Sequence, residues 1–189
     1  RADLLRAAQV AFTTRPVDCD ERWRPGESPI VYVARLAREK ALLALSRDGG
    51  HDGLVLAADT AVWFDERAPP LGKPRDRDAA RRMLTELITR REHAVSTAFA
   101  LVDGRAPSRR RERVVTTRVW TRALSGAQLE RALDRYLDTD EWTDKAGGYG
   151  IQGHAAGLVA RIDGSYTAVV GLPLAEVLDA LWDIRQGSA

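Results

Sequence analysis

The sequence has a single cysteine, Cys19, and no long apolar run among its 189 residues. One cysteine cannot form a disulfide within the chain, so we expect a protein of the reducing cytoplasm. No stretch approaches the ~20 apolar residues that a membrane-spanning helix needs, and the first residues lack the apolar core of a secretory signal. We therefore expect a cytoplasmic protein with no membrane association.

Signatures of structural zinc sites and of nucleic-acid binding are also scarce. His51, His93 and His154 have no metal-ligand spacing, and no cysteine cluster accompanies them. The formal net charge is only +2, and the one dense basic run extends from Arg109 to Arg113. A glycine and a proline precede this run, so we interpret it as the exposed tip of a hairpin and expect no nucleic-acid partner.

The overall composition is that of an ordinary globular protein, with 44% apolar and 30% charged residues. The chain contains no long linker, internal repeat or low-complexity block. A chain of this size buries roughly 70% of the surface that its unfolded form exposes. We therefore expect one domain over residues 1–189.

Capping residues and hydrophobic periodicity predict the secondary structure. Helices are expected from Pro29 until Gly49-Gly50, over 79–87 after the cap Asp76, from the capping box Ser125-Gly-Ala-Gln128 through 136, and over 174–184. Strands are expected over 54–58, 94–102, 114–120, 158–162 and 168–170. Because β-α-β order and a hairpin both occur, we expect an α/β domain with a mixed sheet.

The segment KAGGYGIQG, residues 145–153, is called the glycine-rich segment below, and it contains a formal match to G-x-G-x-x-G. A dinucleotide-binding loop needs a buried strand before it and a helix after it. Here a polar stretch precedes and a strand-like stretch follows, so the pattern does not indicate such a loop. The segment is either a purely structural turn or a turn whose accessible backbone presents Lys145 and Gln152 to a ligand.

Several polar residues stand in apolar surroundings. Lys40 starts from the apolar face of its helix, so its ammonium either reaches the surface or meets an anion in a cleft. Asp59 directly follows an apolar strand, at the kind of strand end where α/β proteins bind ligands. Asp20-Glu21 and Gly72-Lys73-Pro74 stand in loops. Together these residues predict a polyphosphate site in which Mg²⁺ bridges carboxylates and phosphates.

These residues occur within a longer series of short motifs. In chain order, the series is Asp20-Glu21, residues 35–41, Ala58-Asp59-Thr60, Gly72-Lys73-Pro74, His93 with Val95 and Thr97, residues 144–153 and residues 164–173. In their joint order they resemble the Maf family of nucleoside triphosphate pyrophosphatases, also called septum formation inhibitor proteins, over almost the whole chain. The resemblance implies a mixed α/β fold with an elongated sheet, flanking helices and a cleft between two lobes.

The resemblance also implies a reaction. Members of the family cleave a nucleoside triphosphate between its α- and β-phosphates with the help of Mg²⁺ or a similar ion such as Mn²⁺. By position, Asp59 would be the proton acceptor that activates water, and Glu21 would join it in holding the metal. Lys40 and Lys73 would contact the phosphates and stabilise their charge, and Lys145 would do the same.

Two further positions bear on the substrate. Thr60 and Gln152 match the family members that act on dTTP and UTP, whereas those acting on 7-methyl-GTP carry other residues there. A glutamine amide both donates and accepts, so it can pair with the edge of a uracil or thymine ring. We therefore expect pyrimidine nucleotides as substrates, with 7-methyl-GTP as the alternative.

The chain departs from the family pattern in two places. Arg1 matches the last arginine of a Ser-x-Ser-Pro-Arg-Arg loop that contacts substrate in the family, and we expect the rest of that loop to precede it. Arg90 stands where the family has a glycine, before His93, so the geometry of that turn is an open question.

A function of a different class stays open. The chain could restrain septum formation by binding a division partner, which would require a large exposed apolar patch. The five tryptophans are expected in the core or in a subunit contact, so a homodimer also stays open.

Overall fold

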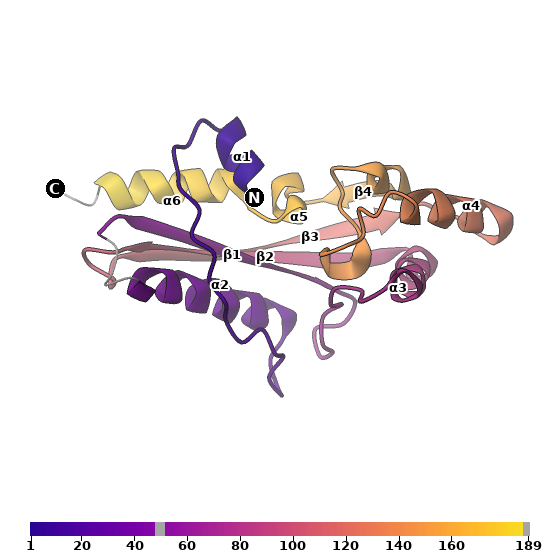
Figure 1. Cartoon of the computed structure of the whole chain (residues 1–189), viewed down its shortest axis with the longest axis horizontal. Helices are drawn as coiled ribbons and strands as arrows, with labels where there is room; N and C mark the ends of the chain where they lie inside the picture. The colour runs from indigo at the N-terminus through magenta and orange to yellow at the C-terminus, as the bar shows by residue number, and fades with distance from the viewer. Residues whose placement is uncertain (48–51, 187–189) are drawn as a thin grey trace.

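The described residues, 1–47 and 52–186 of the computed structural model, build an elongated sheet with helices on both sides (Figure 1). The strands are β1 (Leu54–Trp63), β2 (Glu92–Asp103), β3 (Arg110–Thr121) and β4 (Val159–Asp163). The helices are α1 (Ala2–Ala7), α2 (Pro29–Ser46), α3 (Arg77–Arg90), α4 (Gly126–Leu137), α5 (Tyr166–Val170) and α6 (Leu174–Gln186), with 3-10 turns η2 (Ala146–Gly148) and η3 (His154–Leu158). The predicted α/β fold, with helices flanking an elongated sheet, is confirmed.

The strands lie in the order β1-β2-β3-β4, and every strand pair among the described residues is antiparallel. The parallel pairing that a mixed sheet implies is therefore not present in this part of the chain. The connection from β1 to β2 explains the difference, because α3 lies beyond the end of β1 rather than across the sheet (Figure 1). The chain therefore enters β2 at the end of the sheet where it left β1, which makes the two strands antiparallel. β1 is an edge strand, because β2 is its neighbour in the strand order.

Local capping chemistry accounts for the starts of the long helices. The Ser28 side chain accepts a hydrogen bond from the Val31 N–H at the start of α2, and the Asp76 side chain accepts one from the Ala79 N–H at the start of α3. Both caps were predicted and satisfy otherwise unpaired helical N–H groups. The predicted capping box at Ser125 does not form, because the Ser125 side chain accepts no hydrogen bond from a described residue of α4. The predicted stop at Gly49-Gly50 lies outside the described residues.

Two predicted segments have a different structure. Residues 168–170 were expected as a strand but belong to α5, because the Ser165 hydroxyl caps the Ala168 N–H and overrides the strand preference of two valines. The basic run was expected at a hairpin tip, but its residues from Arg110 on pair with β2 as part of β3. Glu112, inside that run, forms an ion pair with Arg38 of α2.

The core divides into clusters on the two faces of the sheet. Alternate residues of β2 face opposite sides, as in any strand. Ala94, Ala98 and Ala100 pack in one cluster with α2. On the other face, Phe99 packs with α6, and Val95 belongs to a cluster that includes residues of α3 and α4. One lobe is therefore formed around α2 and α6 at one end of the sheet, and the other around α3 and α4 at the other end (Figure 1).

The tryptophans differ in exposure. Trp63 and Trp142 are buried, as expected for core residues, whereas Trp182 on α6 is 66% exposed. A homodimer stays a prediction.

No helix within the described residues is both long enough and apolar enough to cross a membrane.

Candidate active site

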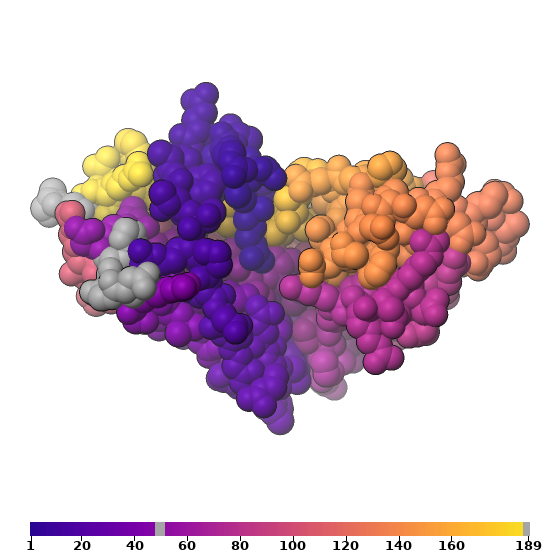
Figure 2. Space-filling view, viewed as in Figure 1, coloured from indigo at the N-terminus to yellow at the C-terminus, as the bar shows by residue number. Residues whose placement is uncertain are grey.

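A cavity of about 830 Å³ opens between the two lobes. Figure 2 shows the hollow between the N-terminal segments in indigo and the magenta and orange parts of the chain. Its volume lies in the range typical of small-molecule sites. The cavity is lined by seven of the eight predicted site residues, Arg1, Glu21, Asp59, Thr60, Lys73, Lys145 and Gln152. The eighth, Lys40, contacts two of them.

Residues 59–62 of β1, an edge strand of the sheet, line this cavity. Asp59 pairs with Ala98 and Thr60 with Thr97 in the β1–β2 register, so the two side chains point to opposite faces of the sheet. Both still line the cavity, because it extends around the strand edge. The expectation that Asp59 stands at a strand end is wrong, since β1 continues to Trp63.

Lys40 of α2 joins the two predicted acids. Its Nζ lies 2.5 Å from Asp59 Oδ1 and 2.6 Å from Glu21 Oε1, and its side chain is only 16% exposed. Burial alone would lower the pKa of Lys40, but the two carboxylates more than offset it and the pKa is raised. The hydrogen bond from Lys40 in turn lowers the pKa of Glu21. Lys40 therefore stays charged and meets carboxylates, not the free solvent.

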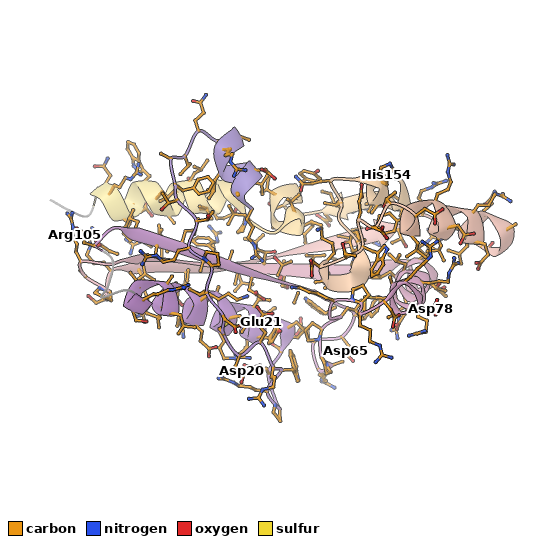
Figure 3. All side chains as sticks on the ribbon, viewed as in Figure 1. Asp20, Glu21, Asp65, Asp78, Arg105 and His154 are labelled. Atoms are coloured by element: carbon orange, nitrogen blue, oxygen red, sulfur yellow. The ribbon has the colours of Figure 1, made fainter. Side chains whose placement is uncertain are left out.

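The neighbouring Asp20 behaves differently. Figure 3 shows Asp20 and Glu21 side by side in the N-terminal segment below the sheet. Asp20 accepts two hydrogen bonds of 2.8 Å from the exposed Arg22 and is not part of the cavity lining. Of this predicted acidic pair, only Glu21 reaches the cluster around Lys40.

The two carboxylates suit a hard divalent cation. Glu21 and Asp59 each bind the same ammonium, so their oxygens converge on a position that a cation already occupies. Within the described residues, no group of three or more His, Cys, Asp or Glu side chains could hold a metal. Mg²⁺ often binds through one or two carboxylates plus substrate phosphates. The residues present therefore fit an ion that binds together with a phosphate-bearing ligand.

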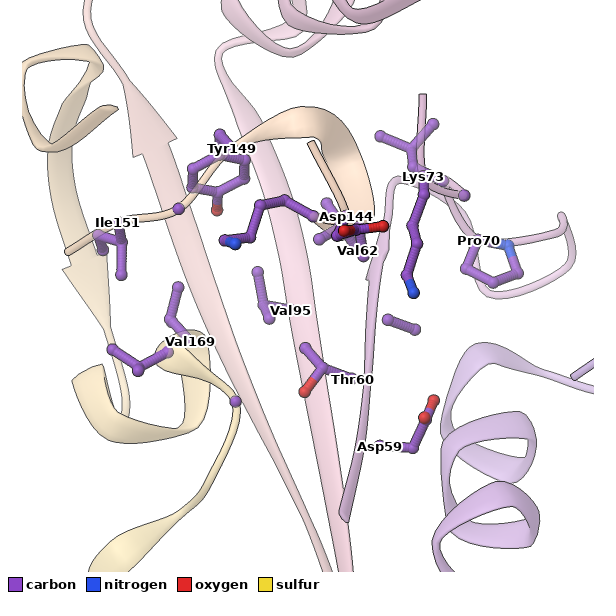
Figure 4. Close-up of a pocket in the computed structure, with 18 of the residues that line it drawn as sticks. Asp59, Thr60, Val62, Pro70, Lys73, Val95, Asp144, Tyr149, Ile151 and Val169 are labelled. Atoms are coloured by element: carbon purple, nitrogen blue, oxygen red, sulfur yellow. The ribbon is translucent and has the colours of Figure 1, made fainter. Parts of the chain in front are cut away.

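Two more cations line the cavity without a direct ion pair to a described residue, although Lys73 helps to lower the pKa of Glu21 and Lys145 that of Glu141. Neither Lys73 nor Lys145 forms an ion pair with a described residue, and neither ammonium has a hydrogen-bond partner there. Figure 4 shows Lys73 pointing into the cavity on the side of Asp59. Unpaired ammonium groups facing a cavity attract anions, and phosphate is a common partner.

Hydrogen bonds hold the other face of β1 in place. The Thr60 and Thr97 hydroxyl oxygens lie 2.9 Å apart, and Thr97 Oγ1 donates to the Ala168 carbonyl at 2.7 Å. Arg1 Nε donates to the Gly171 carbonyl at 2.8 Å, and its Nη2 donates to Thr60 Oγ1 at 3.4 Å. Burial lowers the pKa of Arg1, although Asp59 and Glu21 oppose the shift. Thr60 and Arg1 thus occupy one wall of the cavity together.

The glycine-rich segment is fastened to the loop that carries Lys73. The Gly147 N–H donates to the Gly72 carbonyl at 3.0 Å, and Leu71 beside it donates to the Val62 carbonyl of β1 at 2.7 Å. Gly147 has a φ of +71°, and a Cβ there would lie 3.1 Å from the Val62 side chain, so glycine is required. Gln152 is exposed, and its amide has no partner among the described residues.

Sequence reasoning gave no role to several residues of the cavity. Asp144 and Tyr149 both line it, and Figure 4 places Asp144 near Lys73 and Tyr149 on the side of Ile151. Trp23 and Tyr32 also line it and pack together with ring centroids 5.4 Å apart. The signal that was present for Tyr149 is its position between two glycines.

The turn with the unusual Arg90 forms without a glycine. Arg90 ends α3, and Arg91 adopts the left-handed conformation with a φ of +69° while its N–H donates to the Leu87 carbonyl. The Arg90 guanidinium lies 4.4 Å from the centre of the Phe64 ring. The turn therefore connects α3 to β2 although Arg90 stands where the family pattern has a glycine.

Comparison with known proteins gives a consistent result. The family model described as "Maf-like protein" matches residues 1–184. A protein of Roseobacter denitrificans named dTTP/UTP pyrophosphatase is 44% identical over 178 residues, covering 94% of this chain and 88% of that protein. Proteins with the same name from Myxococcus xanthus and Citrifermentans bemidjiense are 44% and 41% identical, each over 96% of this chain and 86% and 89% of their own lengths. The chain therefore belongs to the Maf-like protein family.

Proposed function

We propose that this chain is a nucleoside triphosphate pyrophosphatase, built as one domain, that hydrolyses dTTP, UTP and related modified pyrimidine nucleotides to the monophosphate and pyrophosphate. One observation carries the proposal: the Lys40, Asp59 and Glu21 cluster shares a cavity with the unpaired Lys73 and Lys145. The names of the relatives support the same reaction and the same substrates.

The reaction is attack of water on the α-phosphorus. Asp59 accepts a proton from the water while the water oxygen forms a bond to the α-phosphorus. The bond from the α-phosphorus to the bridging oxygen breaks, and pyrophosphate leaves with that oxygen. Lys40 holds the Asp59 carboxylate at 2.5 Å and fixes its direction. Lys73 and Lys145 offset the charge on the departing pyrophosphate.

A divalent ion, Mg²⁺ or Mn²⁺, would be held by Glu21 and Asp59. When bound, it supplies positive charge to the phosphate oxygens and makes the phosphorus more electrophilic. Glu21 is half exposed, with 50% of its side-chain surface accessible, and its pKa is lowered by Lys40. It therefore stays ionised and accessible as a ligand at neutral pH.

The base would bind at the end of the cavity formed by the glycine-rich segment. The exposed Gln152 amide presents an N–H donor beside a carbonyl acceptor, which matches the edge of uracil or thymine. Thr60, held by Arg1 and Thr97, lies between that end and Asp59 in the close-up (Figure 4). 7-methyl-GTP is the alternative substrate, and a side-by-side assay separates the two.

The test measures pyrophosphate released from UTP, dTTP, CTP and 7-methyl-GTP by the full chain with Mg²⁺. We expect release from UTP and dTTP, and a loss of at least ~100-fold in the Asp59→Asn variant, since removal of a positioned proton acceptor costs that much or more. Asp179→Asn, an exposed change on α6 outside the cavity lining, is the matched control and should keep full activity. Absence of pyrophosphate release from every nucleotide would overturn the proposal.

A further inference from the structure

The proposed reaction leaves one buried titratable residue without a role. His93, near the start of β2, is only 3% exposed. Its Nε2 lies 2.7 Å from the hydroxyl oxygen of Tyr149, and the two rings meet edge to face with centroids 5.5 Å apart. This contact joins the second residue of β2 to the glycine-rich segment, 56 positions later in the sequence.

His93 stays neutral in this environment. Leu84, Ile88 and Leu158 line the small space around its ring, and burial lowers its pKa to about 4. A neutral imidazole can either donate to or accept from the tyrosine hydroxyl, so the bond persists at neutral pH. The Nδ1 atom has no partner among the described residues, so the bond to Tyr149 is the polar contact that the ring makes there.

Tyr149 connects the core to the cavity. Its ring lines the cavity, whereas its hydroxyl reaches His93. The residues on either side, Gly148 and Gly150, have no side chains, so Tyr149 supplies the inward-facing side-chain hydrogen bond of this stretch, here called its anchor, next to the buried apolar side chain of Ile151. The Gly150 N–H donates to the Tyr136 hydroxyl at 3.3 Å, a longer contact than the 2.7 Å bond of Tyr149.

We infer that His93 is a positioning residue, whose bond to Tyr149 fixes the glycine-rich segment so that Lys145 and Gln152 face the nucleotide. Lys145 lies four residues before Tyr149 and Gln152 three residues after it, so a displacement of the anchor moves both. The inference rests on the proposed function, because it takes a pyrimidine nucleoside triphosphate as the ligand.

The first experiment is a double-mutant cycle. Tyr149→Phe removes the hydroxyl and keeps the ring, and His93→Phe removes the partner. We expect each to raise KM for UTP by about 10-fold, the effect of losing one buried hydrogen bond, with a smaller change in kcat. Each should also reduce the preference for UTP over CTP. The double variant should be no worse than either single variant, because the pair acts as a unit.

A rescue and a control separate positioning from general stability. His93→Gln keeps a hydrogen-bonding group and should recover part of the KM effect. Ser96→Ala removes two hydrogen bonds from the opposite face of the same strand, one that Ser96 Oγ accepts from Trp63 Nε1 at 3.0 Å and one between Ser96 Oγ and Thr116 Oγ1 at 2.8 Å. It should lower the melting temperature as Tyr149→Phe does but leave KM and base preference unchanged. If Ser96→Ala changes KM as much as Tyr149→Phe does, the inference is wrong.

A second readout is independent of hydrolysis. Amide hydrogen exchange without nucleotide should be slow at residues 145–153 in the parent chain and at least several-fold faster in Tyr149→Phe, with Ser96→Ala unchanged. If no nucleotide is hydrolysed by the parent chain, the proposed function fails, and the exchange experiment still reports on the anchor. Unchanged exchange in Tyr149→Phe, or faster exchange with unaltered KM and base preference in an active enzyme, would overturn the inference.

Discussion

The two ends of the cavity are held together by different forces. At the end beside α2, Lys40, Asp59 and Glu21 hold one another through ion pairs of 2.5 and 2.6 Å. At the other end, neutral hydrogen bonds hold the glycine-rich segment, through the Gly147 N–H and the Tyr149 hydroxyl. Ion pairs place charge where phosphate chemistry needs it, whereas neutral bonds determine shape. Changes at the first end should therefore affect kcat and its pH profile, and changes at the second should affect KM and base preference.

The largest effect is expected from Lys40→Met. Without the ammonium, the Asp59 and Glu21 carboxylates repel each other and the pKa of Glu21 rises, since Lys40 is what lowers it. We expect kcat/KM for UTP to fall by ~100-fold or more, and the acid limb of its pH profile to move to higher pH. Arg38→Met, which removes an exposed cation of the same helix, is the control. An acid limb at the same pH in Lys40→Met and the parent chain would show that Lys40 does not control the ionisation of the carboxylates at this end of the cavity.

A stability effect should arise at the neutral end. His93 has a pKa of about 4 in the fold, against an ordinary value of 6.5. The unfolded chain therefore binds a proton at higher pH than the folded chain, so acid favours unfolding. The contribution, about 3 kcal/mol, is complete above pH 6.5 and is lost as pH falls toward 4. Urea unfolding between these pH values should show it, and His93→Gln should flatten the dependence. An equal slope in both proteins would mean that other groups cause it.

Gly147→Ala should move the glycine-rich segment directly. The position has a φ of +71°, and the added Cβ would meet the Val62 side chain at 3.1 Å. Strain of this kind costs of order 1–3 kcal/mol, so we expect KM for UTP to rise by about 10-fold while kcat changes little. Gly157→Ala is the matched control, because nothing lies within 4 Å of a Cβ there. Equal KM values for the two variants would contradict the assigned role of the turn.

The same contrast explains how far the sequence alone could lead. Lys40 and Asp59 were predicted because each stands out within its own apolar segment, although the continuation of β1 past Asp59 was missed. The polar pair Asp59-Thr60 interrupts an apolar run and resembles its end. The pairing of His93 with Tyr149 had no local signal, although each residue lies within a recognised motif, since the two meet across 56 positions. Long-range pairs of this kind depend on how the lobes pack, which a single sequence does not display.

The smallest effect is expected at the outer side of the glycine-rich segment. Glu141 accepts hydrogen bonds from the His154 N–H at 2.8 Å and from its Nδ1 at 2.6 Å, just after Gly153. Figure 3 shows His154 at the surface of the lobe that contains α3 and α4, and its side chain is 70% exposed. Exposed polar contacts contribute little, so Glu141→Gln should raise KM for UTP by less than about threefold. Steady-state assays beside Tyr149→Phe test the ranking. A larger effect for Glu141→Gln would mean that the segment is held mainly from the solvent side, because the buried anchor would then be the weaker of the two.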